Sequence, residues 1–504
     1  RYPPNPPKEG EKYTYALQAE PILAERLEKE EDVKNLIEMA QKLEGMTRNI
    51  GMHAGGVVIA PGKLTDFCPL YQQPGSDSAV SMFDKDDVEQ IGLVKFDFLG
   101  LATLTILEIA REFIQKRHKG QENFKFEDIP LDDWPTYKLF QEGKTEAVFQ
   151  FESRGMQGML KEARPSRLED LIALNALYRP GPMDLIPSFV ARKHGTEVIE
   201  YPHPLVEKVL AETYGIMVYQ EQVMQTAQVL GGYSLGGADL LRRAMGKKKP
   251  EEMAQHRLLF REGAGKQGIP PEKADEVFDL MEKFAGYGFN KSHAAAYSLL
   301  AYHTAWIKVH YTAEFFCGNM TVEMDNTDKL KVLHEDALKM GLTFEPPDVN
   351  RGGYRFEPVT DKVIRYGLGA IKGSGQAAIE AIIAARNGQG PGPQGHVQGP
   401  FKSLWDFCTR VDRAKLNKRT LEALIKAGAF DSIERNRAAL MAATDAAFEF
   451  ANAQWANAHQ GGLFDMMGDD AQGASSQAPE LPQTLPWGIK ERLMQEKTAV
   501  GFYL

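Results

Sequence analysis

Asp97 is the residue for which a chemical role is easiest to argue. It lies in GLVKFDFLGL, a stretch whose polar and apolar residues alternate as in a β-strand. Val94, Phe96 and Phe98 are predicted to share one face, which packs in a core. Lys95 shares the other face, roughly 7 Å from Asp97 at strand spacing. Because a buried carboxylate without a partner costs several kcal/mol, Asp97 is expected to pair with Lys95, another side chain or a metal ion.

The most basic stretch is LLRRAMGKKKP. It holds five cations within eight residues: Arg242, Arg243, Lys247, Lys248 and Lys249. Such cations repel one another unless they face water or an anion, so the stretch is either a solvated basic face or a phosphate or triphosphate site. It is not a Walker A loop, because Gly246 has no glycine five residues before it and Lys247 is followed by another lysine.

A polar run follows in FAGYGFNKSHAAAY, between a glycine-rich turn and a predicted helix. It consists of Asn290, Lys291, Ser292 and His293. The amino end of a helix that carries lysine and serine favours anions, which predicts a phosphate site. The alternative for His293 is a structural role.

Glycines punctuate GLGAIKGSGQAAIEAII, from Gly367 to Ile383. Their spacing differs from that of a dinucleotide-binding fingerprint. It fits a helix-hairpin-helix, in which Gly373 and Gly375 let backbone amides approach a DNA phosphate. A glycine-rich turn without a ligand is the alternative.

A Leu-Phe pair stands out in the polar segment QGGLF, residues 460–464. An exposed apolar pair of this kind is typical of a peptide that anchors in a partner's groove.

The elements that must position these residues are read from composition and periodicity. We expect helices over 15–45, a small sheet within 48–101 and a mostly helical region over 103–345. We also expect a flexible loop at 387–400, a stretch of low complexity, and a linker at 465–486, which is poor in apolar residues and rich in Gly, Ser, Pro and acidic residues.

Overall composition sets the broad class. A chain of 504 residues predicts three or four domains. The net charge of −10 does not exclude nucleic acid, because binding depends on local patches. The sequence has no apolar run long enough to span a membrane, and its three scattered cysteines fit a reducing, cytoplasmic compartment.

Several long strings together resemble one family, the alpha subunit of bacterial DNA polymerase III, a C-family replicative polymerase. The resemblance covers essentially the whole chain. The strings that carry it are RNIGMHAGGVVIAP, GLVKFDFLGL, AVFQFESRGM, LYRPGPMD, YGIMVYQEQVMQ, LGGADLLRRAMGKKK and FAGYGFNKSHAAAYSLLAYHTAWIK.

The resemblance implies template-directed DNA synthesis, in which dNTPs are added to a primer 3′ end with two Mg²⁺ ions. It implies that Asp97 is the third of three metal-binding palm carboxylates. The incoming nucleotide would be bound by Lys95, Arg242, Arg243, Asn290, Lys291, Ser292 and His293, with His293 near the sugar. Primer-template DNA would be bound by Lys247, Lys248, Lys249, Lys372, Gly373, Gly375, Asn417, Lys418 and Arg419. A sliding clamp would bind Gln460, Leu463 and Phe464.

The resemblance also implies an α+β multidomain fold. It combines a small nucleotidyltransferase-like palm sheet, large helical fingers and a tandem helix-hairpin-helix. The expected domains are part of the thumb at 1–50, the second part of the palm at 51–102, the fingers at 103–345 and the helix-hairpin-helix region at 346–445. Residues 446–504 would hold the clamp-binding motif and a linker, and would lead into an oligonucleotide-binding domain. Separate proofreading and clamp-loader subunits are expected as further partners.

One departure from the family matters. The family's other two carboxylates lie in a Pro-Asp-x-Asp-x-Asp-Phe motif, and this sequence lacks it. We therefore expect a fragment that does not polymerise DNA by itself. Two alternatives stay open: a non-catalytic, clamp-recruited DNA-binding scaffold, and a nucleotidyltransferase that acts on RNA.

Overall fold

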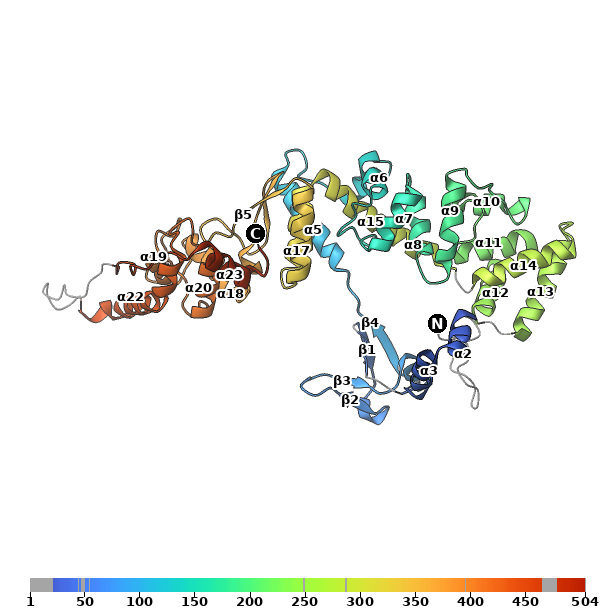
Figure 1. Ribbon diagram of the computed structural model, residues 1–504, viewed down its shortest axis with the longest axis horizontal. Helices are drawn as coiled ribbons and strands as arrows, with labels where there is room; N and C mark the ends of the chain where they lie inside the picture. Colours follow the sequence, from blue (N-terminus) through green and yellow to red (C-terminus); the bar gives the residue numbers. More distant parts are fainter. Residues whose placement is uncertain are drawn as a thin grey trace. The chain divides into compact units, whose positions relative to one another are not determined.

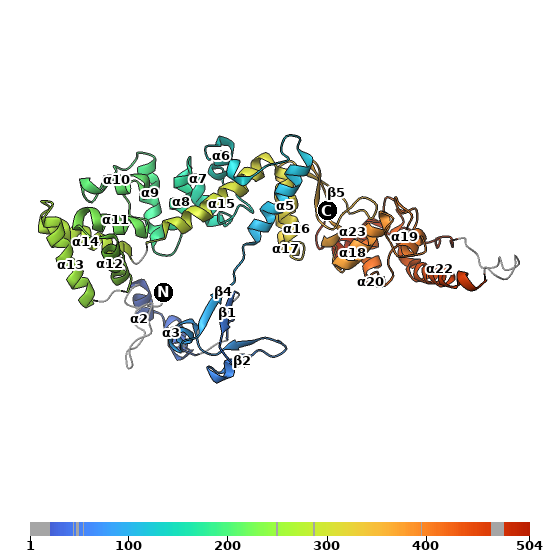
Figure 2. The same ribbon diagram turned by 180° about the vertical axis from the view of Figure 1, so that it is seen from behind.

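The computed structural model describes residues 21–43, 45–46, 50–53, 55–247, 250–285, 288–394, 396–464 and 478–503. The chain divides into two compact units, residues 1–100 and 101–504. Both units are drawn in Figures 1 and 2. In the described part, no helix is both long and apolar enough to cross a membrane.

Unit 1 holds short helices and two small sheets. Its helices are α2 (Pro21–Lys29), α3 (Glu31–Leu43) and α4 (Lys85–Gln90). Its strands are β1 (Gly56–Ile59), β2 (Leu70–Gln72), β3 (Ala79–Ser81) and β4 (Val94–Asp97). Strands β1 and β4 pair antiparallel, with Gly56 opposite Asp97, and β2 pairs with β3. The predicted strand around Asp97 is therefore present.

The prediction of its buried face is wrong. The side chains predicted to lie in a core are exposed: Val94 by 54%, Phe96 by 44% and Phe98 by 67%. The small core of unit 1 is built on Cys68, Val88 and Leu93, and the partly buried Val58 packs against it. Val58 is opposite Lys95 in the sheet, so the core lies on the face that carries Lys95.

Unit 2 begins with the helical region predicted for 103–345. Its α-helices are α5 (Ala102–Arg117), α6 (Trp134–Gln141), α7 (Arg154–Ala163), α8 (Leu168–Leu177), α9 (Ile186–Lys193), α10 (Glu207–Leu210), α11 (Gln220–Gly231), α12 (Leu235–Lys247), α13 (Pro250–Gly265), α14 (Pro271–Ala285), α15 (Lys291–His310), α16 (Thr312–Val322) and α17 (Thr327–Lys339).

The second half of unit 2 adds a small sheet and more helices. The strands are β5 (Thr343–Glu345), β6 (Glu357–Thr360) and β7 (Val363–Arg365), in the order β5-β7-β6. The helices are α18 (Gln376–Arg386), α19 (Leu404–Arg410), α20 (Lys418–Lys426), α21 (Arg437–Ala442), α22 (Thr444–Phe464) and α23 (Ile489–Val500). This mostly helical α+β architecture confirms the predicted fold class.

Two hydrophobic cores hold unit 2 together. The larger core runs from Leu107 in α5 to Phe502 beyond α23. The smaller core lies between residues 206 and 285, where α11, α12, α13 and α14 pack against one another (Figure 1). The cations of α12 are therefore mounted on a separately packed group of helices.

The glycine-rich stretch 387–400 is a loop, but it is anchored rather than free. The guanidinium of Arg410, whose side chain is 1% exposed, donates to the carbonyls of Val397, Gly399 and Pro400 at 2.6, 2.8 and 3.4 Å. It also donates to the carbonyl of Ala385 at the end of α18, at 3.0 Å. One buried cation thus satisfies loop carbonyls that composition alone suggested would face solvent.

Candidate functional site

Asp97 sits in unit 1 with its side chain exposed. Its carboxylate makes no hydrogen bond or ion pair with any residue that the structure describes. Lys95 instead forms an ion pair with Glu89 at 2.8 Å and donates to the carbonyl of Lys85 at 2.9 Å. The prediction that Asp97 is buried is therefore wrong, and so is its pairing with Lys95, because α4 supplies the acceptors of Lys95.

In unit 2 the start of α11 joins two predicted sites. The side chain of Gln220 accepts from Arg242 in α12 at 3.4 Å and donates to the carbonyl of Gly288 at 3.1 Å. The Gln220 amide also donates to the carbonyl of Phe289 at 2.9 Å. The structure thus brings Arg242 beside the segment that leads into α15, as the phosphate-site interpretation requires.

The arginine pair of α12 already has an anion. Arg242 and Arg243 form ion pairs with the two carboxylate oxygens of Asp239, at 2.8 and 2.9 Å. Hydrogen bonding from Arg242 holds the pKa of Asp239 below its usual range. Arg243 keeps 63% of its side chain exposed and Arg242 keeps 23%. A ligand phosphate would therefore compete with Asp239 for these two guanidinium groups.

The amino end of α15 is occupied in the same way. The side chain of Asn290 caps the helix by accepting from the amide of His293 at 2.8 Å. The carboxylate of Glu221 accepts from the Lys291 amide at 3.0 Å and from the Asn290 side chain at 2.9 Å. The ammonium of Lys291 pairs with Glu212 at 2.7 Å. This helix end does attract an anion, and here the anion is the protein's own carboxylate.

The last two residues of the polar run are exposed. Ser292 and His293 both face solvent. The ring of His293 stacks on that of Tyr297 with centroids 4.2 Å apart, and its edge meets Phe289 at 5.3 Å. An exposed imidazole fixed between two aromatic rings is held in one place without being buried.

Sequence reasoning missed the acids of this site and Gln220. Asp239 precedes Arg242 and Arg243 by three and four residues, a helical spacing that could have revealed the pairing. Glu212 and Glu221 are 79 and 70 residues from Lys291, so no local pattern connects them.

The predicted DNA-binding residues around the glycine-rich turn come together. Gly373 has a φ of +88°, a conformation that favours glycine. Its carbonyl accepts from the hydroxyl of Thr420 at 3.1 Å, which ties the turn to the start of α20. Asn417 caps α20, and Lys418 is paired with Asp445 at 2.6 Å. The exposed Lys372 and Arg419 flank the turn.

Some predicted residues cannot be placed. Lys248 and Lys249 lie outside the described residues, and the side chain of Lys247 is not described. The predicted clamp motif falls at the carboxyl end of α22, where the backbone is helical. The side chains of Gln460, Leu463 and Phe464 likewise lie outside what the structure describes.

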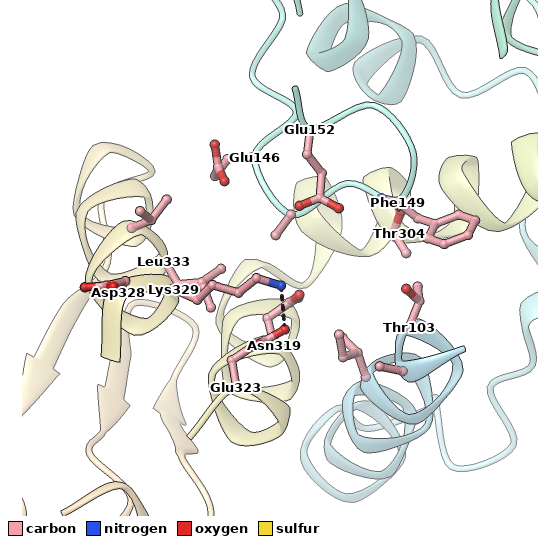
Figure 3. A pocket seen from close by; sticks show the side chains of 14 residues that line it. Thr103, Glu146, Phe149, Glu152, Thr304, Asn319, Glu323, Asp328, Lys329 and Leu333 are labelled. Atoms are coloured by element: carbon pink, nitrogen blue, oxygen red, sulfur yellow. Dashed lines mark hydrogen bonds and ion pairs between the residues drawn. The ribbon is translucent and has the colours of Figure 1, made fainter. Parts of the chain in front are cut away.

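A cavity of about 390 Å³ lies elsewhere in unit 2 (Figure 3). It is lined by residues of α5, α15, α16 and α17 and by the loop 146–152. Lys329 forms an ion pair with Glu323 at 2.9 Å inside it, and burial raises the pKa of Glu146. Among the predicted site residues that the structure describes, none lines this cavity.

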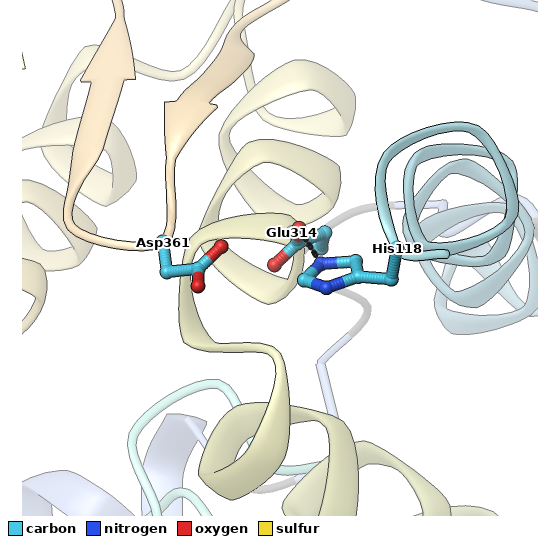
Figure 4. A group of neighbouring side chains, drawn as sticks. All are labelled: His118, Glu314 and Asp361. Carbon is cyan, nitrogen blue, oxygen red and sulfur yellow. Dashed lines mark hydrogen bonds and ion pairs between the residues drawn. The ribbon is translucent and has the colours of Figure 1, made fainter. Parts of the chain in front are cut away.

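A further cluster joins three segments of unit 2 (Figure 4). His118, after α5, approaches the buried carboxylate of Glu314 in α16 at 2.8 Å, and Asp361 follows β6 nearby. These residue types can bind a metal ion. Arg117, however, already forms ion pairs with both Glu314 and Asp361. A fixed guanidinium therefore supplies the counter-charge, and the cluster acts as an ion-pair connection.

Comparison with known families follows this division of the chain. Residues 5–100 match the bacterial DNA polymerase III alpha NTPase domain, and residues 103–268 match the finger domain of the same subunit. Residues 341–440 match a helix-hairpin-helix motif. The three matches cover unit 1, the region that carries Arg242, and the region of the Gly373 turn.

Curated relatives are similar in sequence to this chain along almost its entire length. The DNA polymerase III subunit alpha of Neisseria meningitidis is 57% identical over 97% of this chain and 41% of its own length. The same subunit of Xylella fastidiosa is 52% identical over 95% of this chain and 40% of its own length. The same subunit of Escherichia coli is 51% identical over 99% of this chain and 43% of its own length. The chain thus spans about two-fifths of the length of these relatives. It belongs to the family of bacterial DNA polymerase III alpha subunits.

Proposed function

We propose that this chain contributes to template-directed DNA synthesis in a bacterial replicase, where dNTPs are added to a primer 3′ end. The observation that carries the proposal is the convergence of Arg242, Asn290 and Lys291 at the start of α11. We assign residues 1–50 to the thumb, 51–102 to the palm, 103–345 to the fingers, 346–445 to the helix-hairpin-helix region and 446–504 to the clamp motif and linker.

Asp97 is proposed as a metal ligand of the palm. Its exposed carboxylate, with no ion-pair partner among the described residues, offers the hard oxygen atoms that Mg²⁺ prefers. When bound, two such ions activate the primer hydroxyl and stabilise the leaving pyrophosphate. Lys95 would release Glu89 to face phosphate oxygens. The 504 residues lack the paired-aspartate motif of the family, so we expect no primer extension by them alone.

The triphosphate is proposed to bind by exchange of anions. Its oxygens would replace Asp239 at Arg242 and Arg243, and Glu212 at Lys291. This exchange keeps every cation paired before and after binding, and the displaced carboxylates of Asp239 and Glu212, which are about one third exposed, would be solvated instead. His293, fixed by Tyr297 and Phe289, would border the sugar, and Ser292 would lie beside it.

The helix-hairpin-helix region is proposed to bind the backbone of primer-template DNA without reading sequence. The contacts would come from the amides at Gly373 and Gly375, from Lys372, and from the start of α20 at Asn417, Lys418 and Arg419. Lys247, Lys248 and Lys249 would add charge from the fingers. Binding should therefore weaken steeply with salt.

The remaining partners rest on family membership. We propose that Gln460, Leu463 and Phe464 bind a sliding clamp, and that proofreading and clamp loading belong to separate subunits in the cytoplasm. The helical backbone at the end of α22 would present this motif next to the helix-hairpin-helix region.

The test measures dNTP use by a polypeptide of the relatives' full length that carries this chain. Arg242→Ala should raise the KM for dNTP by roughly tenfold or more and leave primer-template affinity unchanged, because it removes a triphosphate contact. Arg257→Ala is the matched control, since this arginine of α13 is paired with Asp275 and Asp279 outside the site. Equal KM values for Arg242→Ala and wild type would contradict the assignment and favour a DNA-binding scaffold.

A further inference from the structure

The chain returns to the helix-hairpin-helix region after residue 477. Ala499, Val500 and Phe502 are buried in the large core of unit 2. The carbonyl of Ala499 accepts from the Lys372 amide at 2.8 Å, directly beside the glycine-rich turn. Helix α23 lies against α20, and both views draw it with α18 and α20 (Figures 1 and 2). The end of α23 is therefore a structural neighbour of the proposed DNA-binding turn.

The turn itself offers unused hydrogen-bond donors. Among the described residues, the amides of Gly373, Gly375, Gln376 and Ala377 have no acceptor. They precede or begin α18, where helix geometry leaves amides unpaired and favours an anion. On their own these amides would mark only a helix end, so the surrounding charges decide what the surface can bind.

Two cations, Lys372 and Arg419, flank the turn, and a third, Lys497 of α23, is connected to Lys372 through Gly501. The ammonium of Lys372 lies beside Gly501, because a Cβ placed on that glycine would be 2.9 Å from it. The Gly501 amide donates to the carbonyl of Lys497 at 2.7 Å. Lys497 thus lies one helical turn before Gly501, the residue beside which the Lys372 ammonium lies. Arg419 approaches from α20, with its Nε 3.6 Å from a Cβ built on Gly373.

None of these three cations makes an ion pair with a described residue, whereas their neighbours do. Lys418 is paired with Asp445, and Arg437 uses both Asp431 and Glu496. Asp445, Asp431 and Glu496 are therefore already paired with other cations. The positive charge of Lys372, Arg419 and Lys497 remains uncompensated beside unpaired amides, which is the arrangement expected for a polyanion.

We propose that the carboxyl end of α23 forms a second side of the DNA-binding surface, with Lys497 contacting a backbone phosphate near the one at the Gly373 turn. Tyr503 positions Lys497, whose ammonium lies 4.9 Å from the centre of the tyrosine ring. This proposal rests on the DNA-binding role proposed for the turn. It adds a contact from beyond residue 440, where the helix-hairpin-helix match ends.

The test is equilibrium binding of the 504-residue chain to a labelled duplex at several salt concentrations. Lys497→Gln should weaken binding several-fold at low salt. It should also reduce the slope of log affinity against log salt by about 0.9, the value for one lost phosphate contact. Tyr503→Leu should weaken binding less, because the ammonium remains. Lys490→Gln is the matched control, since Lys490 lies on the same helix and face, roughly 10 Å away.

The outcomes separate this inference from the function on which it rests. A paired variant, Lys372→Gln with Arg419→Gln, tests the turn itself. If it weakens binding while Lys497→Gln matches wild type in affinity and slope, the role of α23 is wrong and the turn remains a DNA site. If none of the variants changes affinity or slope, the DNA-binding role of the whole region is wrong.

Discussion

At the scale of single residues, the cations of the proposed nucleotide site are neutralised by acidic side chains of the same chain. Lys291 is paired with Glu212, and Arg242 and Arg243 are paired with Asp239. An incoming triphosphate must replace these carboxylates, so each acid sets the affinity of the cation that it holds. Removing one acid should therefore strengthen nucleotide binding, whereas removing a cation should weaken it.

Glu212→Gln tests this competition directly. The change releases the Lys291 ammonium and removes one negative charge, so the affinity of the chain for a dNTP with Mg²⁺ should rise roughly two- to fivefold. Equilibrium titration measures this effect. Glu207→Gln, an exposed acid of α10 without a partner among the described residues, is the control. Unchanged or weaker binding by Glu212→Gln alone would show that Lys291 is not a phosphate contact.

Backbone strain lies in the loop between α6 and α7. Gln150 is exposed and has a φ of +67°, which glycine adopts without strain. Gln150→Gly should raise the free energy of unfolding by about 0.5–1 kcal/mol. Urea unfolding followed by tryptophan fluorescence reports on unit 2 alone, because all 5 tryptophans lie beyond residue 100. As a control, Lys161→Gly in the regular helix α7 should lower the free energy of unfolding by about 1 kcal/mol. An equal decrease for Gln150→Gly would show that Gln150 is not strained.

At the scale of elements, sequence periodicity predicted most of the architecture. The strand at Asp97, the helical region after it and the glycine-rich turn before α18 all occur where expected. Alternation, however, defines two faces without saying which one a core covers. The face of Val94, Phe96 and Phe98 was assigned wrongly because the small core of unit 1 is built from other segments.

The candidate site was less predictable than the fold. Cations gather locally in LLRRAMGKKKP and FNKSH, and their patterns predicted anion binding. Asp239 pairs with the arginines from within α12, but the other partners come from α11 and from the residues before it, so only the folded chain brings Gln220, Glu212 and Glu221 beside these cations. The buried contacts of Arg410 with loop carbonyls are likewise set by tertiary packing and have no local signature.

The docking of α23 should depend on pH. His334 packs against Phe344 and Phe502, with ring centroids 4.5 and 5.3 Å away. Burial lowers the pKa of His334, and the nearby Glu335 only partly offsets this. A histidine whose pKa is lowered in the folded state stabilises that state fully at pH values above its unfolded pKa of 6.5. This stabilisation is lost as the pH falls through the pKa of the folded state.

Hydrogen exchange measures this effect. Protection factors of the α23 amides should fall between pH 7.5 and pH 5.5 in the wild type. They should fall less in His334→Phe, which keeps the ring packing and cannot be protonated. Identical pH profiles for the two proteins would show that His334 does not control the docking of α23.

At the scale of the whole molecule, the two units differ in how much core they contain. The described part of unit 1 buries three hydrophobic side chains in its core, whereas unit 2 has two large cores. Phe98 and Leu99, next to the boundary between the units, are 67% and 72% exposed. Unit 1 should therefore unfold and be cleaved first.

Limited proteolysis with a low-specificity protease checks this order. A product that begins near Leu101 should accumulate while unit 1 is degraded, and its tryptophan fluorescence should remain native. Early cleavage within α5 to α17, before any loss of unit 1, would show that the units are not independently stable.

Asp97 is proposed to be the carboxylate that this chain supplies to the palm of a polymerase. The most direct measurement is primer extension by a polypeptide of the relatives' full length that carries this chain, wild type against Asp97→Asn, with primer-template affinity measured on both. We predict a loss of several orders of magnitude in rate with nearly unchanged DNA affinity, because a metal ligand is removed without altering the DNA-binding surface. Extension at a rate close to wild type would contradict the metal-ligand role and make Asp97 an ordinary exposed carboxylate.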